Sequence, residues 1–325
     1  MEFPIDADGY IRCERAISLG YDRHSLSRAA RAGELVPVAP GIYAVPADRT
    51  PEALHRTRVL AAQSAPDAAV SHGSAAVMRG LSMLSPDLSA LDLTSATSGR
   101  GYRRRHRHIH PGPLEPSDVE EVDGIWLTTL ERTAFDVART SPHGFAGALA
   151  VFDAALRMGA DPAVMSGYGR EPRTGVGVAR RALAFADPRS ENPGESWSRA
   201  QMIAAGITPP TLQREIFDRR GNFVARTDFD WVDENGVVTL VGEFDGLGKY
   251  LKYLRPGESP EQVIKREKTR EGRLQDLGIV ITRWLFTDLV AQRMAPRLIA
   301  QLRTLRLPTP TPIRAVANPA LGRPA

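Results

Sequence analysis

The sequence has few of the features that mark a membrane or secreted protein. Its single cysteine, Cys13, excludes an intrachain disulfide and agrees with a reducing compartment. No stretch reaches the roughly 18 consecutive apolar residues of a membrane span. The start, MEFPIDADGY, lacks the basic and apolar regions of a signal peptide. We therefore expect a cytoplasmic protein with no membrane partner.

Composition and length indicate a globular protein of more than one domain. Apolar residues make up 42% of the 325 residues and charged residues 25%, which is typical of globular proteins, and the chain is too long for one ordinary core. The formal net charge of +4 permits nucleic-acid binding without requiring it. We predict a mixed α/β protein with four parts: 1–50, 51–190, 191–304, and a disordered Pro-rich tail over 305–325.

The first part has the pattern of a winged helix-turn-helix. Two helical stretches end at Gly20 and Gly33, and two short strands follow around Pro40-Gly41. The second helix carries hydroxyl and basic residues, which suit base edges and phosphates. We predict that it binds duplex DNA, with the hairpin touching the backbone. A small helical domain with a solvated basic face is the alternative. The residues expected near the groove are Ser25, Ser27, Arg28 and Arg31.

The middle part, an α+β region, contains the basic run GYRRRHRHIH at 101–110. His106, His108 and His110 alternate, so in a strand they would share one face, which suggests a metal site. However, no cysteine or carboxylate stands at a ligand spacing beside them. We therefore favour a basic hairpin whose arginines add nonspecific nucleic-acid affinity, namely Arg103, Arg104 and Arg105.

Carboxylates gather at the ends of two strands expected in the third part. The run VVTLVGEFDG is apolar until Glu243 and Asp245, and Asp228 lies on the strand before it. Neighbouring antiparallel strands would place Asp228 beside Glu243, and Glu195 on the preceding helix could join them. Such oxygens suit Mg²⁺ or Mn²⁺, which would activate a water and hold a phosphodiester. Charged strand ends beside a solvated helix are the alternative.

The third part also resembles a known superfamily. The stretches GESWSRAQMIAAGI, RTDFDWVDENGVVTLVGEFDGLGKY, KREKTREGRLQDLG and ITRWLFTDL are similar to very-short-patch-repair-endonuclease-like domains of the PD-(D/E)xK superfamily. The resemblance covers about residues 191–290. It implies a restriction-endonuclease-like mixed sheet flanked by helices, and metal-dependent phosphodiester cleavage.

The resemblance also assigns roles by position. It makes Asp228 the motif aspartate and Glu243 the motif glutamate, so these two are the expected metal ligands. Asp245 stands where the superfamily usually has a lysine, and Lys249 is the substitute we expect. With Glu195 these residues form the expected catalytic group. If Lys249 does not substitute, the domain is a binding module without catalysis.

The N-terminal part resembles antitoxins of the AbiEi type, from type IV toxin–antitoxin systems. The matching stretches are GYDRHSLSRAARAGELVPVAPGIYAV, VSHGSAAVMRGL and GIWLTTLERTAFDVAR, within about 1–140. The resemblance implies a DNA-binding repressor and a cognate toxin as a second partner. Two functions stay open: a DNA-directed, metal-dependent endonuclease, and a non-enzymatic antitoxin-like repressor whose nuclease fold only binds.

Overall fold

The computed structural model describes residues 3–6, 9–47, 50–61, 64–97, 99–104, 106–246 and 259–308. Internal contacts group the chain into two units, residues 1–144 with 158–180, and residues 145–157 with 181–325. Arg105, Lys249 and most of the expected Pro-rich tail lie outside the described residues. The mixed α/β prediction is confirmed, whereas the division at residues 50, 190 and 304 stays a prediction.

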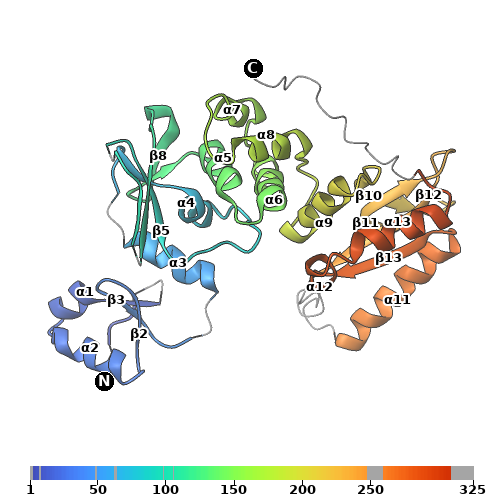
Figure 1. The fold of residues 1–325 in the computed structure, drawn as a ribbon. Helices are drawn as coiled ribbons and strands as arrows, with labels where there is room; N and C mark the ends of the chain where they lie inside the picture. The colour runs from blue at the N-terminus through green and yellow to red at the C-terminus, as the bar shows by residue number, and fades with distance from the viewer. Residues whose placement is uncertain are drawn as a thin grey trace, which may run out of the picture. The chain divides into compact units, whose positions relative to one another are not determined.

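The first unit begins with the expected pair of helices and hairpin. The elements are β1 (Tyr10–Arg12), α1 (Cys13–Ser18), α2 (Arg23–Arg31), β2 (Val36–Ala39) and β3 (Ile42–Ala44) (Figure 1). The strands form a sheet in the order β1-β3-β2. The sequence pattern did not predict β1. Gly33, which follows α2, has a φ of +76°, a conformation that glycine adopts without strain and that ends helices.

The core of this region lies beneath α2. Leu26 and Ala29 of α2 are buried against Ile11 and Ala16. Because Leu26 and Ala29 are three residues apart, they lie on one side of the helix. The opposite side of α2 is therefore left to polar residues.

A six-stranded sheet forms the middle of the first unit, in the order β6-β7-β5-β4-β9-β8. Its strands are β4 (Ala68–Val70), β5 (Leu91–Ser95), β6 (Tyr102–Arg104), β7 (Arg107–Pro111), β8 (Val119–Val122) and β9 (Ile125–Thr128). The helical elements of the region are α3 (Pro51–Leu60), α4 (His72–Arg79), η1 (Pro116–Asp118), α5 (Leu130–Thr140) and α7 (Pro162–Gly167). The strands β6 and β7 pair antiparallel, as expected of the basic hairpin.

The second unit contains the expected succession of helix, three strands, helix, strand and helix, except that the single closing helix expected from the sequence is two helices. The elements are α9 (Pro193–Ala204), β10 (Thr211–Phe217), β11 (Phe223–Val232), β12 (Val238–Asp245), α11 (Pro260–Asp276), β13 (Val280–Leu285), α12 (Phe286–Val290) and α13 (Met294–Thr304). The apolar helix α6 (Gly144–Arg157) contributes most of its length to this unit, and α8 (Val176–Phe185) spans both.

The sheet of the second unit has the order β10-β11-β12-β13, with β12 and β13 parallel. A parallel pair needs a long crossover, and α11 lies in it. Local capping defines the helix starts as expected. Asn192 accepts from two backbone N–H groups of α9, and Ser259 forms a capping box with Gln262 at α11.

The core of the second unit is built around Trp284 of β13. Its ring lies so close to Gly242 that a Cβ there would stand 2.6 Å from it, so only glycine fits at that point of β12. Phe229 stacks on Trp284 with ring centroids 5.4 Å apart. This packing fixes β12 between its neighbours and positions the residues at its end. Among the described helices, none is both long and apolar enough to cross a bilayer.

Candidate nucleic-acid interface and carboxylate cluster

The exposed side of α2 carries four polar residues in one stripe. Helical spacing places positions 24, 27, 28 and 31 on the same face. His24, Arg28 and Arg31 are exposed there, and Ser27 is half-buried. Arg28 keeps 70% of its side chain exposed, and the nearest Asp22 oxygen is 3.8 Å from its Nη2. Its guanidinium is therefore accessible to a phosphate.

Ser25 is placed differently from the other three residues expected at the groove. It is buried, and its hydroxyl donates to the Asp22 carbonyl over 2.6 Å. It therefore stabilises the first turn of α2 from inside. His24 occupies the exposed face, although it was not among the residues expected near the groove.

The hairpin tip lies where a wing would. Pro40 and Gly41 join β2 to β3 and are both exposed, and the φ of +72° at Gly41 suits the tight turn.

The arginines of the basic hairpin β6–β7 are less available to bind nucleic acid than those of α2. Arg103 donates to Asp87 over 2.7 Å, and Arg104 lies over the Tyr102 ring. Arg105 lies outside the described residues.

Glu243, at the end of β12, lies between two arginines. Arg270 of α11 donates to both carboxylate oxygens, at 2.6 and 2.9 Å, and Arg283 of β13 donates to Oε2 at 2.9 Å. Burial opposes ionisation, but the two guanidiniums outweigh it and hold the pKa of Glu243 below its usual value. The buried carboxylate therefore already has positive partners.

Arg283 was not among the site residues expected from the sequence. Parallel pairing puts Arg283 directly opposite Glu243. The sequence feature that could have identified it is a lone arginine in the otherwise mainly apolar strand VITRWL. A charge in such a strand is costly to bury unless an acidic residue pairs with it. Arg283 also donates to Glu271 over 2.9 Å.

Glu195 and Asp228 form the acidic part of this region. Glu195 is 4% exposed and accepts hydrogen bonds from Glu191 N and from Gln213 Nε2. Burial first, and then the charge of Asp228, raise the pKa of Glu195 to about 7. Asp228 accepts from Phe244 N over 2.9 Å, which places it beside the end of β12 as expected.

The fit of a divalent cation to this region depends on the lone pairs that remain. Three N–H groups of Arg270 and Arg283 point at Glu243, and a carboxylate offers about four acceptor positions. One position on Oε1 remains for a metal. Among the described residues, Glu195, Asp228 and Glu243 do not bring three ligand atoms within 4.8 Å of one another. Asp245 is half-buried at the strand end, and Lys249 lies outside the described residues.

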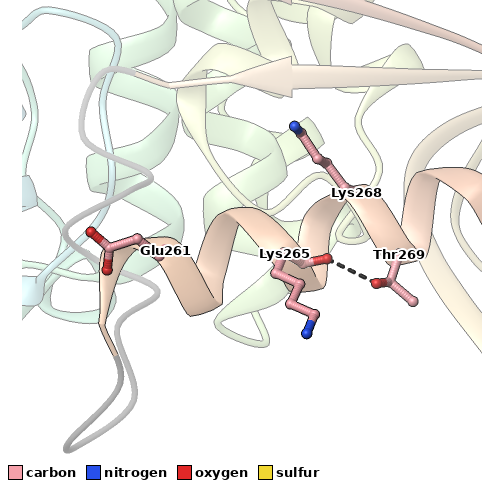
Figure 2. Close-up of a pocket in the computed structure, with 4 residues that line it drawn as sticks. All are labelled: Glu261, Lys265, Lys268 and Thr269. Carbon is pink, nitrogen blue, oxygen red and sulfur yellow. Dashed lines mark hydrogen bonds between the residues drawn. The ribbon is translucent and has the colours of Figure 1, made fainter.

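The exposed face of α11 adds a basic hollow of about 430 Å³. Figure 2 shows its four lining residues along one helix, with the Thr269 hydroxyl donating to the Lys265 carbonyl. Lys265 and Lys268 are exposed, and the figure shows their ammonium groups pointing to different sides of the helix. This open surface suits an extended anion more than a compact ligand.

A buried ionic network lies in the first unit, within the stretch LERTAFDVART of α5. Arg132 donates to Asp136 over 2.7 Å and to Asp118 over 2.9 Å, and Arg139 donates to the other oxygen of Asp136 over 2.8 Å. Arg132 is 3% exposed and Asp136 is completely buried. Because Asp136 is buried between the two arginines, the structure gives these residues a packing role.

Comparison with known proteins assigns a family match to the N-terminal region alone. Residues 6–46 match the family described as transcriptional regulator, AbiEi antitoxin, which confirms the N-terminal resemblance over β1 to β3. Two relatives from Mycobacterium tuberculosis strains, uncharacterized protein Rv2248 and uncharacterized protein MT2308, are each 29% identical over 298 residues. Each match covers 88% of this chain and 98% of the relative. The family match does not extend to the C-terminal unit, whereas the relatives match nearly the whole chain.

Proposed function

We propose that this protein is a DNA-binding transcriptional regulator of the AbiEi antitoxin type. The observation that carries the proposal is the winged helix of residues 10–44 with an exposed stripe of His24, Ser27, Arg28 and Arg31 on α2. It coincides with the family match over residues 6–46. Arginines supply the phosphate contacts that dominate affinity, and short polar side chains can read base edges.

The test is binding of the full chain to a duplex that covers the promoter of its own gene, followed by fluorescence anisotropy. We expect tighter binding to this duplex than to a scrambled duplex of the same length. His24→Ala and Ser27→Ala should reduce the difference between the two duplexes, because they remove hydrogen-bonding groups without changing the charge of the arginines. Equal affinity of the wild type for both duplexes would contradict a regulator that recognises sequence.

An antitoxin of this type would also bind a toxin. The resemblance supplies this second partner, and the sites described above do not define where it would bind. Co-expression of the gene with its neighbouring genes, followed by purification of the complex, is the direct measurement. Growth arrest by a neighbouring gene that this protein relieves would support the antitoxin role. If no neighbouring gene product binds this protein or arrests growth, the antitoxin role fails and the regulator role alone stands.

The second candidate is a metal-dependent nuclease in the C-terminal unit. The raised pKa of Glu195 beside Asp228 favours it, because two carboxylates that repel one another are relieved by a bound cation. We propose Asp228 and Glu243 as ligands of Mg²⁺ or Mn²⁺, with Glu195 and Asp245 nearby. Lys249 would polarise the attacking water in place of the motif lysine.

Calorimetric titration with Mn²⁺, run beside a nuclease assay on duplex and single-stranded DNA, distinguishes the two candidates. Under the nuclease proposal, Asp228→Ala abolishes cleavage and the Mn²⁺ binding that depends on this carboxylate, but leaves DNA binding by α2 intact. Metal binding without cleavage would favour a regulator. If the folded wild type binds no Mn²⁺, the nuclease proposal fails.

A further inference from the structure

Asp92, His108 and His110 form a compact cluster in the six-stranded sheet. Each offers one ligand atom, and these atoms lie within 4.8 Å of one another. His110 Nε2 lies 2.9 Å from Asp92 Oδ1, and His108 Nδ1 lies 3.3 Å from the same oxygen. The register of the sheet creates the cluster, since Asp92 of β5 is paired with His108 of β7 and His110 shares the face of His108.

We propose that Asp92, His108 and His110 bind a divalent transition-metal ion such as Zn²⁺. Two imidazoles and a carboxylate form a ligand set that suits zinc and related ions, whereas Mg²⁺ and Ca²⁺ prefer oxygen ligands alone. Ligands about 2.0–2.1 Å from a tetrahedral zinc stand about 3.3 Å from one another. The separations of Asp92 Oδ1 from the two imidazole nitrogens, 2.9 and 3.3 Å, are close to that value.

Neighbouring residues hold the cluster in place. The His72 ring stacks on His110 with centroids 3.6 Å apart. Arg139 donates to His72 Nε2 over 3.2 Å and is held by Asp136. Because arginine only donates, His72 Nε2 is an acceptor and its ring is neutral. The stacked, neutral His72 ring therefore restricts the orientation of the His110 ring.

The backbone supports the same arrangement. His72 has a φ of +48°, a strained conformation for a residue other than glycine that is concentrated at functional sites. The Asp92 N–H donates to Ser74 Oγ over 2.8 Å, which fixes the residue that carries the carboxylate. The strain at His72 therefore lies directly beside the ligand that it orients.

The cluster is accessible to an ion from solvent. The exposed fractions of the side chains are 30% for His108, 13% for His110 and 14% for Asp92. Three protein ligands leave a coordination position for water. The cross-strand neighbour of His108, Arg103, is engaged by Asp87 and Ser89, which reduces its repulsion of a cation. For His110 Nε2 to bind the ion, any hydrogen on this nitrogen must move to Nδ1, as in the other tautomer, or leave to solvent.

The test is calorimetric titration of the chelator-treated full chain with ZnCl₂, in excess Mg²⁺ to occupy carboxylate sites. We expect one equivalent of Zn²⁺ to bind the wild type. His108→Ala and Asp92→Asn should lose this equivalent. His106→Ala is the matched control, because it removes an exposed histidine from the same hairpin, and it should bind as the wild type does.

A second measurement separates loss of the site from loss of the fold. Thermal unfolding is followed with and without Zn²⁺, which raises Tm only in proteins whose folded state binds it. His108→Ala, at the most exposed ligand, should unfold cooperatively at the wild-type Tm without Zn²⁺ and show no rise with it. The proposal is overturned if the folded wild type binds no stoichiometric Zn²⁺, if His108→Ala still binds it, or if His106→Ala loses it equally.

Discussion

The arginines of two regions of the protein differ in their environment: those on α2 are exposed, and those in the C-terminal unit are paired with carboxylates. On α2, Arg28 and Arg31 are exposed to solvent. In the C-terminal unit, Arg270 and Arg283 direct their N–H groups at Glu243 and at acidic neighbours on α11. Because a guanidinium already bonded to a carboxylate has fewer donors left for a phosphate, the residue type alone does not identify a DNA contact. The arginines of α2 are suited to binding, and the paired ones to stability.

The buried network of α5 should give the largest effect on stability. Asp136→Ala leaves Arg132 and Arg139 without their shared carboxylate, and breaking a buried pair in this way costs about 3–5 kcal/mol. The measurement is hydrogen exchange of the α5 amides, which reports the free energy of opening. Asp67→Ala, at an exposed aspartate, is the control and should change stability by less than about 0.5 kcal/mol. Equal effects of the two substitutions would contradict a structural role for these arginines.

The Glu195 carboxyl should make stability depend on pH. Its pKa rises from 4.5 to about 7 on folding, so between these values the folded state binds more protons than the unfolded chain. Stability therefore falls as the pH rises through this range, by on the order of 3 kcal/mol. Glu195→Gln should remove this dependence in urea unfolding between pH 5 and pH 8. A wild-type slope of the opposite sign, or an unchanged slope in the variant, would show that Glu195 is ionised throughout.

Substitution of Glu243 tests how much its ion pairs with Arg270 and Arg283 stabilise the second unit. Glu243→Gln removes the buried counter-charge that Arg270 and Arg283 share and leaves them only the partly exposed acids of α11. Since both arginines are partly exposed, we expect a loss of about 1–3 kcal/mol. Tryptophan fluorescence during urea unfolding reports mainly on this unit, because three of the four tryptophans, Trp197, Trp231 and Trp284, lie in it. Glu215→Gln, at an exposed position of β10, is the control. If the Glu243 variant is as stable as this control, the two arginines do not depend on Glu243.

Local signals made most of the fold predictable. Asn192 before Pro193, and Ser259 followed by Gln262, define helix starts within a few residues. The apolar run that ends at Glu243 identified β12. The short strand β1 was missed because three residues carry too little periodicity. Sheet order was also outside the reach of these patterns, since it depends on which strands pair across long stretches of chain.

The candidate sites differ in the same way: local spacing predicts some of their residues, whereas others depend on strand pairing. The exposed stripe of α2 could be inferred because helix spacing alone determines it, apart from the buried Ser25. The pairing of Glu243 with Arg283 depends on β12 lying parallel to β13. Likewise, no carboxylate stands at a ligand spacing from the alternating histidines in the sequence, because Asp92 comes from a neighbouring strand. A side chain that reaches a site across a sheet leaves no spacing signal.

The smallest effect on stability is expected at α2, where the effect on binding should be largest. Arg28→Ala with Arg31→Ala should alter the free energy of unfolding by less than about 0.5 kcal/mol, because both side chains are exposed. The charge-matched control is Arg219→Ala with Arg220→Ala, in the exposed turn after β10. Far-UV circular dichroism and urea unfolding should show all three proteins equally folded.

The most direct measurement of the regulator proposal is the salt dependence of duplex DNA affinity in these three proteins. Each phosphate contact contributes about 0.9 to the slope of log affinity against log salt. The α2 variant should therefore bind more weakly, with a slope reduced by about 1.8. The turn variant should keep the wild-type slope. An unchanged affinity and slope in the α2 variant, or an equal reduction in both variants, would contradict DNA binding through α2.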